Sequence, residues 1–275
     1  MISDRVLARL KTAAELPDLS ATRYRLIEEI GRGGLGVVYL AEDAELGRQV
    51  AIKILDDARE ARVLASLEHP GIVPVHEAGR LADGRCYYAM KLIRGTRLDV
   101  FLEGAGHLPD RLRLFQRICE PVAFAHSRGV VHRDLKPSNI MVGEFGEVLV
   151  MDWGAPDVGT PAFMAPEQSA GGDVDGRADV FALGQILKIA LKNEAPKPLI
   201  AICQRATNPD RTLRYAGPLE LAADVAAYLD HRPVSAYRES VGERLLRFAS
   251  RNRTLLALVA AYLAMRIIII FWLGR

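Results

Sequence analysis

The spacing of hydrophobic residues changes along the chain and predicts strands first and helices later. Short apolar runs at 37–40, 50–52, 87–89 and 148–150 are typical of strands. An apolar helix is expected to open at 179–184, and further helical segments are predicted between 198 and 229. Val6, Leu7 and Leu10 recur at helical spacing before Pro17, which predicts a short helix ahead of the first strand.

A nineteen-residue stretch from Leu255 to Leu273 is apolar except for Arg266. A helix of that length is about 28 Å long, close to the roughly 30 Å hydrocarbon core of a bilayer. The favourable free energy of membrane insertion summed over its eleven Leu, Ile, Val and Phe residues exceeds the unfavourable contribution of the single arginine. We therefore predict one transmembrane helix over 254–273. A buried carboxyl-terminal helix or an oligomerisation helix is the alternative interpretation.

Basic residues precede the predicted span, namely Arg244, Arg247, Arg251 and Arg253. By the positive-inside rule, the domain before the span is expected to face the cytoplasm from the inner membrane of the cell. The expected organisation is an amino-terminal segment (1–23), a main domain (24–233), a basic amphipathic juxtamembrane segment (234–253), the span (254–273) and a short tail (274–275).

Composition and charge add few constraints. A formal net charge of +2 in 275 residues gives no reason to expect nucleic acid as a partner. Cys86, Cys119 and Cys203 are scattered, so neither a disulfide framework nor a zinc site is predicted, and a reducing compartment fits. Residues 1–22 have no continuous apolar core and are not a signal peptide.

The segment 132–139, His-Arg-Asp-Leu-Lys-Pro-Ser-Asn, places Asp134, Lys136 and Asn139 in one loop. Chemistry that deprotonates a hydroxyl, neutralises a phosphate and holds a divalent cation needs these three polar groups together. Every specified position of the pattern H-R-D-L-x-x-x-N is filled. The alternative is a structural loop with a coincidental sequence.

Two further motifs precede this loop. Residues 31–38 fill G-x-G-x-x-G-x-V, whose glycines let backbone N–H groups approach phosphate closely. A strand-like stretch follows it, which argues against a dinucleotide-binding turn, because that turn opens a helix. Residues 50–53, Val-Ala-Ile-Lys, come fourteen residues after Gly36, and Lys53 is expected to reach phosphate from a strand.

In this order the motifs resemble those of the bacterial branch of the eukaryotic-type Ser/Thr protein kinases. The resemblance implies an α+β fold of two lobes, with ATP bound between them and its γ-phosphoryl group transferred to Ser or Thr hydroxyls of proteins. It implies that Asp134 orients and deprotonates the hydroxyl, that Lys136 neutralises the moving group, and that Thr160 bonds near both of them. Asn139 and Asp152 are expected to hold Mg²⁺ or Mn²⁺, and Lys53 to pair with Glu60 of a helix.

The hinge between lobes is expected at 90–93, and Val38 and Ala51 are expected to cover the adenine ring. By the same resemblance, Glu167 is expected to pair with Arg214, and Asp179 to brace the backbone of the 132–139 loop. The residues expected to bind the nucleotide are Ile30, Gly31, Arg32, Gly33, Gly34, Leu35, Gly36, Val37, Val38, Ala51, Lys53, Met90, Lys91, Leu92 and Ile93.

Three segments are shorter than the family pattern. Glu60 follows Lys53 by only seven positions, so the helix that carries Glu60 is expected to be short. Only residues 155–158 lie between the Asp152-Trp153-Gly154 motif and the Gly159–Glu167 segment. In that motif, Trp153 occupies the position that is usually Phe. Residues 192–197 replace a long segment that docks substrates in relatives. These departures raise the alternative of a catalytically weak pseudokinase that acts as a membrane-bound scaffold, and a small-molecule phosphotransferase is a third possibility. The favoured interpretation implies ATP, protein substrates and the lipid bilayer as partners, and leaves homo-oligomerisation open.

Overall fold

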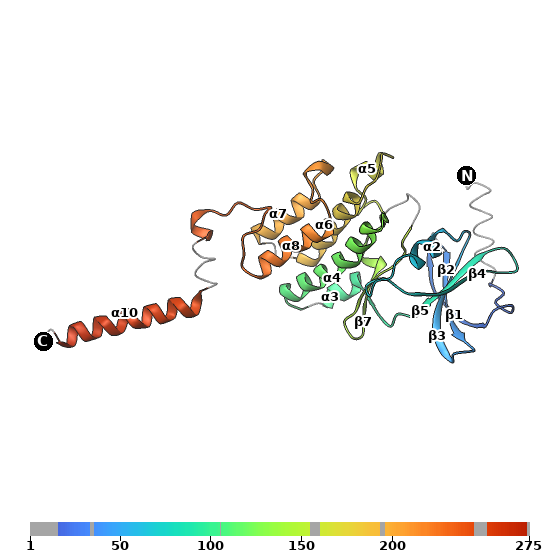
Figure 1. Cartoon of the computed structure of the whole chain (residues 1–275), viewed down its shortest axis with the longest axis horizontal. Coiled ribbons are helices and arrows are strands. Elements are labelled where there is room, and N and C mark those ends of the chain that lie inside the picture. Colours follow the sequence, from blue (N-terminus) through green and yellow to red (C-terminus); the bar gives the residue numbers. More distant parts are fainter. Residues whose placement is uncertain are drawn as a thin grey trace.

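Five antiparallel strands form the amino-terminal sheet, in the order β1-β2-β3-β5-β4 (Figure 1). The structure is a computed structural model, and it describes residues 16–33, 36–104, 106–154, 160–192, 196–244 and 252–273. The strands are β1 (Tyr24–Gly33), β2 (Gly36–Asp43), β3 (Arg48–Leu55), β4 (Val75–Arg80) and β5 (Cys86–Lys91). The predicted strands at 37–40, 50–52 and 87–89 are confirmed as β2, β3 and β5.

The two faces of this sheet carry different groups because successive side chains of a strand point to opposite faces. One face is an apolar cluster that includes Val37, Tyr39, Ile52 and Ala89. On the other face, Lys53 is the cross-strand partner of Val38 on β2 and of Tyr88 on β5. Lys53 therefore lies on the face of the sheet opposite this apolar cluster.

The carboxyl-terminal lobe is built around α6 (Arg177–Leu191), in which eleven of fifteen residues are buried. The other helices are α3 (Leu98–Gly104), α4 (Leu108–Ser127), α5 (Pro166–Ser169), α7 (Lys197–Ala206) and α8 (Pro218–Leu229). A small sheet of β6 (Gly95–Arg97), β7 (Ile140–Gly143) and β8 (Val148–Val150) lies beside them, and two 3₁₀ turns span Pro137–Asn139 and Arg211–Leu213. The two-lobed α+β architecture is confirmed.

The helix α2 (Arg59–Ala65) has only seven residues, as the short connection predicted. It connects the sheet to the main hydrophobic core, because Ala61 and Leu64 belong to the same buried cluster as Tyr88 and the helices of the other lobe. A backbone bond of 2.8 Å from the Val150 N–H to the Gly71 carbonyl ties β8 to the segment that follows α2. One hydrophobic cluster therefore spans both lobes, and the apolar cluster on the other face of the sheet is separate from it.

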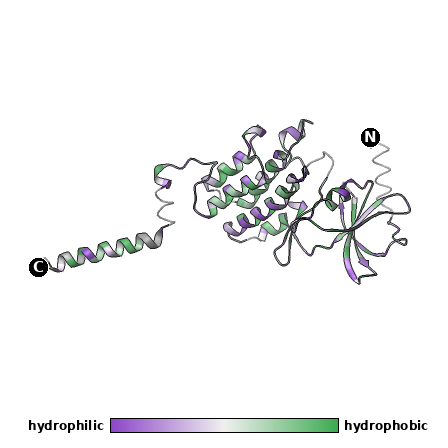
Figure 2. Cartoon of the chain, in the orientation of Figure 1, coloured by the Kyte–Doolittle hydropathy of each residue, from purple (hydrophilic) through white to green (hydrophobic). Residues whose placement is uncertain are grey.

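The carboxyl-terminal helix α10 extends over Arg253–Leu273 and consists mainly of hydrophobic residues (Figure 2). Within the described parts of the chain, no helix combines the length and apolarity that a membrane crossing requires. Several side chains of α10 lie outside the described residues, as do residues 1–15, 245–251 and 274–275. The predicted amino-terminal helix and residues 245–251 of the juxtamembrane segment therefore fall outside the described residues. The predicted span over 254–273 stays a prediction.

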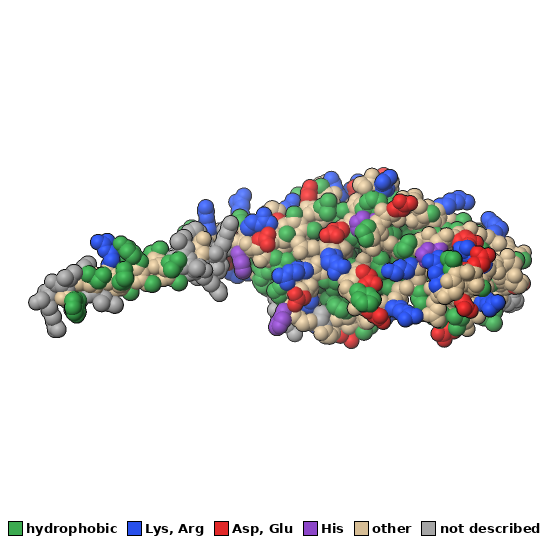
Figure 3. All heavy atoms as spheres, turned by 60° about the horizontal axis from the view of Figure 1, so that its bottom comes forward, with side chains coloured by type: hydrophobic (Ala, Val, Ile, Leu, Met, Phe, Trp, Pro, Cys, Tyr) green, Lys and Arg blue, Asp and Glu red, His purple; other side chains and the backbone are tan. Residues whose placement is uncertain are grey.

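Acidic and basic side chains are interspersed over the face of the two lobes seen in Figure 3. This distribution agrees with the small net charge of the sequence.

Candidate active site

The segment 132–139, named the catalytic loop below, lies between α4 and β7 and is held in place by a buried aspartate on α6. Asp179 accepts hydrogen bonds from the His132 N–H (2.8 Å), the Arg133 N–H (2.9 Å) and His126 Nε2 (2.7 Å). Arg133 has a φ of 69°, a backbone conformation that is uncommon outside glycine. The hydrogen bond from its N–H to Asp179 helps to stabilise this conformation. Burial opposes ionisation of Asp179, but these bonds and the nearby histidines lower its pKa below the usual value. The predicted bracing contact is present.

Asp134 is the centre of a compact polar cluster in this loop. The ammonium nitrogen of Lys136 lies 2.8 Å from Asp134 Oδ2 and 2.8 Å from Thr160 Oγ1. The backbone N–H and the hydroxyl of Thr160 both donate to Asp134 Oδ1, each at 3.0 Å. Four charge-assisted bonds therefore fix the carboxylate, the ammonium group and the hydroxyl relative to one another. The contacts predicted for Thr160 are present.

Asn139 closes the loop from its other end. Its amide nitrogen donates to the carbonyl oxygen (2.9 Å) and to Oδ2 (3.2 Å) of Asp134. The Met151 N–H donates to the Asn139 carbonyl at 2.9 Å, which places Asn139 beside the end of β8, just before Asp152. Since the amide nitrogen is engaged, the amide oxygen is the group that Asn139 can offer to a cation.

Lys53 on β3 links the amino-terminal lobe to the carboxyl-terminal lobe through two ion pairs. Its ammonium nitrogen lies 2.7 Å from Glu60 Oε1 and 2.7 Å from Asp152 Oδ1. Burial alone would lower the pKa of Lys53, but the attraction of Asp152 and Glu60 outweighs it and raises that pKa. Lys53 is therefore charged at neutral pH, and the predicted pair with Glu60 is present.

The residues around Asp152 have an unusual backbone. Asp152 has a φ of 60°, and Gly154 has a φ of 77°. A Cβ at Gly154 would lie 3.3 Å from the Val63 side chain on α2, so this turn passes directly beneath that helix. Trp153 is completely buried and donates through Nε1 to the Val150 carbonyl at 3.0 Å. Its ring packs against His132 in a tilted arrangement, with ring centroids 4.7 Å apart. The indole N–H, which phenylalanine lacks, therefore has a hydrogen-bond partner inside the core.

The segment that begins at Thr160 is anchored by a partly buried ion pair. The Arg214 guanidinium makes two bonds to the Glu167 carboxylate, at 2.6 and 2.8 Å. The neighbouring Gln168 amide donates to the Arg133 carbonyl at 2.8 Å, so this anchor also reaches the catalytic loop. The predicted Glu167–Arg214 pair is present.

The expected nucleotide residues do not all lie together. Val38, Ala51 and Lys53 share one face of the sheet, and Met90 is the cross-strand partner of Ala51. The Val37 side chain is buried in the apolar cluster on the opposite face and points away from the Lys53 face, so only its backbone is on the side expected for the nucleotide.

The glycine loop itself is the β1–β2 turn. Gly31 and Gly33 end β1, Ile30 is about half exposed, and Arg32 pairs with Glu29 at 2.6 Å. Gly36 has a φ of 140°, and a Cβ there would collide with the Ile54 carbonyl oxygen, so only glycine fits. Gly34 and Leu35 lie outside the described residues. At the hinge, β5 ends at Lys91, and Leu92 and Ile93 follow it with partly exposed side chains.

Two contributors to this site were missed by the sequence reasoning. The Tyr88 hydroxyl donates to Glu60 Oε1 at 2.6 Å, and burial together with that carboxylate raises the pKa of Tyr88 well above its usual value. His126 bonds to Asp179 from α4. No local motif marks either residue; only the β3–β5 register, which pairs Lys53 with Tyr88, could have indicated the tyrosine.

Comparisons with known proteins agree with this geometry. A family model described as "Protein kinase domain" matches residues 24–208, about two thirds of the chain. The chain belongs to the protein kinase family.

Among curated relatives of this kinase chain, the DNA damage-responsive serine/threonine-protein kinase RqkA of Deinococcus radiodurans is 39% identical over 62% of this chain and 30% of its own length. The serine/threonine-protein kinase PknD of Chlamydia felis is 32% identical over 77% of this chain and 31% of its own length. The chain therefore spans about 30% of the length of these relatives.

Solved structures of kinases show the same fold. The kinase domain of Mycobacterium tuberculosis PknI superposes with a TM-score of 0.63 at 26% identity, covering 76% of this chain and 96% of that domain. A double mutant of the same domain gives a TM-score of 0.64 at 25% identity, with the same coverage.

Proposed function

We propose that this protein is a Ser/Thr protein kinase that transfers the γ-phosphoryl group of ATP to Ser or Thr hydroxyls of proteins, itself included. The observation that carries the proposal is the continuous set of charged contacts from Glu60 through Lys53 to Asp152, with the Asp134–Lys136–Thr160 cluster beside it. A scaffold without catalytic activity has no chemical need for both.

The residues present have definite tasks in that reaction. Asp134 accepts the proton of the substrate hydroxyl and orients its oxygen, because its carboxylate is fixed by Thr160 and Lys136. Lys136, already directed at this carboxylate, neutralises negative charge that develops on the transferred group. Lys53 holds nucleotide phosphates while Glu60 and Asp152 fix its ammonium group. Catalysis then comes mostly from positioning and charge, since no covalent intermediate is required.

The donor set fits a magnesium or manganese ion bound together with the nucleotide. Asn139 offers an amide oxygen and Asp152 a carboxylate, which are oxygen ligands of the kind that Mg²⁺ prefers. No cluster of three or more His, Cys, Asp and Glu side chains suited to a metal occurs in the described ranges. Mg²⁺ in proteins is commonly held by one or two carboxylates together with substrate phosphates and water. When bound, the cation neutralises phosphate charge.

The test is purified protein incubated with labelled ATP and Mg²⁺, alone and with a generic protein substrate. Incorporation of label into serine and threonine is expected, and Asp134→Asn should lower the rate at least about 100-fold with an unchanged unfolding midpoint. Full activity of the Asp134→Asn protein, or no transfer by the wild-type protein, would contradict the proposal.

We further propose that residues 254–273 anchor this kinase to the inner membrane, with the kinase domain in the cytoplasm. The support is the apolar composition of the segment and the arginines that precede it. The apolar side chains of α10 with a described position are exposed, among them Leu258, Val259, Leu263, Ile267 and Trp272, and a bilayer would cover such a surface.

A further inference from the structure

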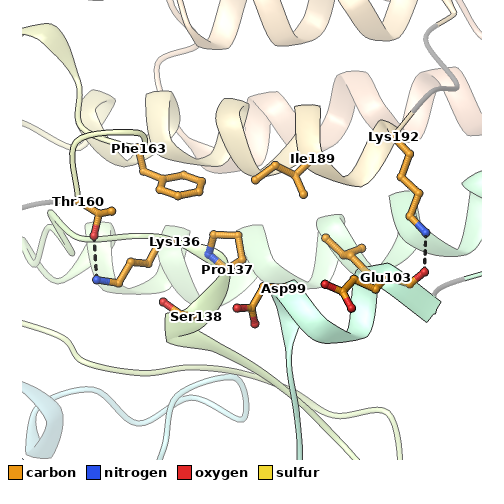
Figure 4. Close-up of a pocket in the computed structure, with 10 residues that line it drawn as sticks. Asp99, Glu103, Lys136, Pro137, Ser138, Thr160, Phe163, Ile189 and Lys192 are labelled. Carbon is orange, nitrogen blue, oxygen red and sulfur yellow. Dashed lines mark hydrogen bonds between the residues drawn. The ribbon is translucent and has the colours of Figure 1, made fainter. Parts of the chain in front are cut away.

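A cavity of about 430 Å³ lies next to the catalytic loop, within the range of roughly 300–1,000 Å³ typical of binding pockets (Figure 4). It is formed where four parts of the chain meet: α3, the catalytic loop, the segment that begins at Thr160 and the end of α6. Its lining residues are Asp99, Leu102, Glu103, Lys136, Pro137, Ser138, Thr160, Phe163, Ile189 and Lys192.

The centre of this cavity is apolar. Phe163 and Ile189 lie on one side of it and Pro137 on the other in Figure 4. Ile189 is 41% exposed although it belongs to the most buried helix of the lobe. An exposed isoleucine beside an open apolar cavity is a surface that a partner side chain can cover with a gain in hydrophobic free energy.

Three of the four charged side chains that line the cavity have protein partners, and the fourth is the Glu103 carboxylate. The Lys192 ammonium group donates to the Glu103 carbonyl at 3.0 Å, and Asp99 pairs with Arg97 at 3.0 Å. Lys136 is engaged by Asp134 and Thr160. The edge therefore carries both signs of charge, whereas the centre offers only apolar contact.

The cavity adjoins the position of the acceptor hydroxyl. Two of its lining residues, Lys136 and Thr160, bond directly to Asp134, the proposed base. In an extended peptide, alternate side chains point to the same side, and residues two apart are separated by about 6.6 Å. A residue two positions from the acceptor can therefore enter this cavity while the acceptor hydroxyl faces Asp134.

We propose that this cavity binds an apolar side chain located two residues from the phosphorylated Ser or Thr, and so selects substrates. The proposal rests on the kinase function proposed above and adds a substrate class to it. Leu, Ile, Met and Phe are the expected occupants, because they fill apolar space without leaving a buried polar group unpartnered.

The test is a library of serine peptides in which each position from −4 to +4 is varied in turn, phosphorylated by the 275-residue protein. Apolar residues at −2 or +2 should raise kcat/KM about tenfold over Asp, Glu, Lys or Arg at the same position. Ile189→Glu should shift the preference at that position towards Lys and Arg, and Ile189→Lys should shift it towards Asp and Glu. The matched control is Ile200→Glu on α7, where an isoleucine of similar exposure (37%) lies outside the cavity and the wild-type preference should persist.

The outcomes separate this proposal from the kinase assignment. Peptide phosphorylation without an apolar preference at −2 or +2, a preference for basic residues there, or the same preference in wild type and both Ile189 variants would overturn the substrate proposal alone. Absence of both autophosphorylation and peptide phosphorylation in the wild-type protein would overturn the kinase assignment and this proposal together. Unfolding midpoints of the three variants within a few degrees of wild type establish that the comparison concerns recognition and not folding.

Discussion

The Lys53 ammonium nitrogen lies 2.7 Å from Glu60 Oε1, and the same oxygen accepts a hydrogen bond from the Tyr88 hydroxyl at 2.6 Å. Lys53 and Tyr88 are cross-strand partners on β3 and β5, so the carboxylate spans two adjacent positions of the sheet. One carboxylate oxygen on the seven-residue helix α2 therefore bonds to side chains of both strands. Asp152 contacts the same Lys53 ammonium nitrogen from the other lobe, at 2.7 Å.

This relationship predicts different losses for two substitutions. Glu60→Gln should lower the rate of phosphoryl transfer about 100-fold, because Lys53 loses a charged partner and its position shifts. Tyr88→Phe removes one hydrogen bond to a carboxylate, worth about 1.5–3 kcal/mol of stability, but it leaves the Lys53–Glu60 pair in place. The rate of phosphoryl transfer should therefore fall by at most about tenfold. Initial rates at saturating ATP, with unfolding midpoints as a control, test both. Equal losses in the two variants would contradict the assignment of Glu60 as the main partner.

A second prediction concerns control of activity. The sequence between Gly154 and Gly159 contains no Ser, Thr or Tyr, and residues 155–159 lie outside the described residues. Thr160, the nearest hydroxyl, is bonded to Asp134 and Lys136, which makes it a poor switch. Basal activity should therefore need no phosphorylation of this loop. Phosphatase treatment followed by rate measurement and site mapping tests this, and a large loss of rate that recovers with phosphate on Thr160 would refute it.

The pH dependence of stability should reflect Asp179. Its pKa is lowered in the folded state, so its contribution is fully present above the unfolded-state pKa of about 3.9 and is lost as the pH falls through the folded-state value. Asp179→Asn should destabilise the protein by about 1–3 kcal/mol at pH 7, because an amide nitrogen replaces an acceptor for backbone N–H groups. The difference from wild type should shrink below about pH 4.

Urea unfolding between pH 7 and pH 3.5 measures this difference. The control is Asp230→Asn, which changes a 60% exposed side chain paired with Arg232 and should shift stability by no more than about 0.5 kcal/mol. A destabilisation by Asp179→Asn that stays constant down to pH 3.5 would argue against a stabilising charge at this position.

The last prediction concerns the carboxyl terminus. A protein truncated after Arg253 should move from the membrane fraction to the supernatant, since the truncation removes the nineteen apolar-rich residues that favour insertion. Carbonate extraction and fractionation measure the change, and protease accessibility in inverted vesicles reports the side on which the kinase domain lies. A truncated protein that still resists carbonate extraction would exclude the anchor, and a protected kinase domain in inverted vesicles would reverse the orientation.

The sequence alone determined the catalytic loop, Lys53 and Asp152, because the chemistry needs these residue types at fixed positions of contiguous motifs. Glu60 was expected from the resemblance to protein kinases, and the shortness of α2 followed from the length of the connection. These predictions depend on order and spacing along the chain, and folding does not change order or spacing.

Tertiary structure decided the features that depend on which residues become neighbours. Val37 and Val38 belong to one motif, yet strand alternation puts Val37 in the apolar core and Val38 beside Lys53. Tyr88 reaches Glu60 across 28 positions, through a strand register that no local pattern specifies. The cavity at Ile189 requires α3, α6 and the catalytic loop to meet, and its shape depends on packing between segments that are far apart in the sequence. A pattern along the chain records chemistry that is local, whereas a contact between distant segments exists only after the chain has packed.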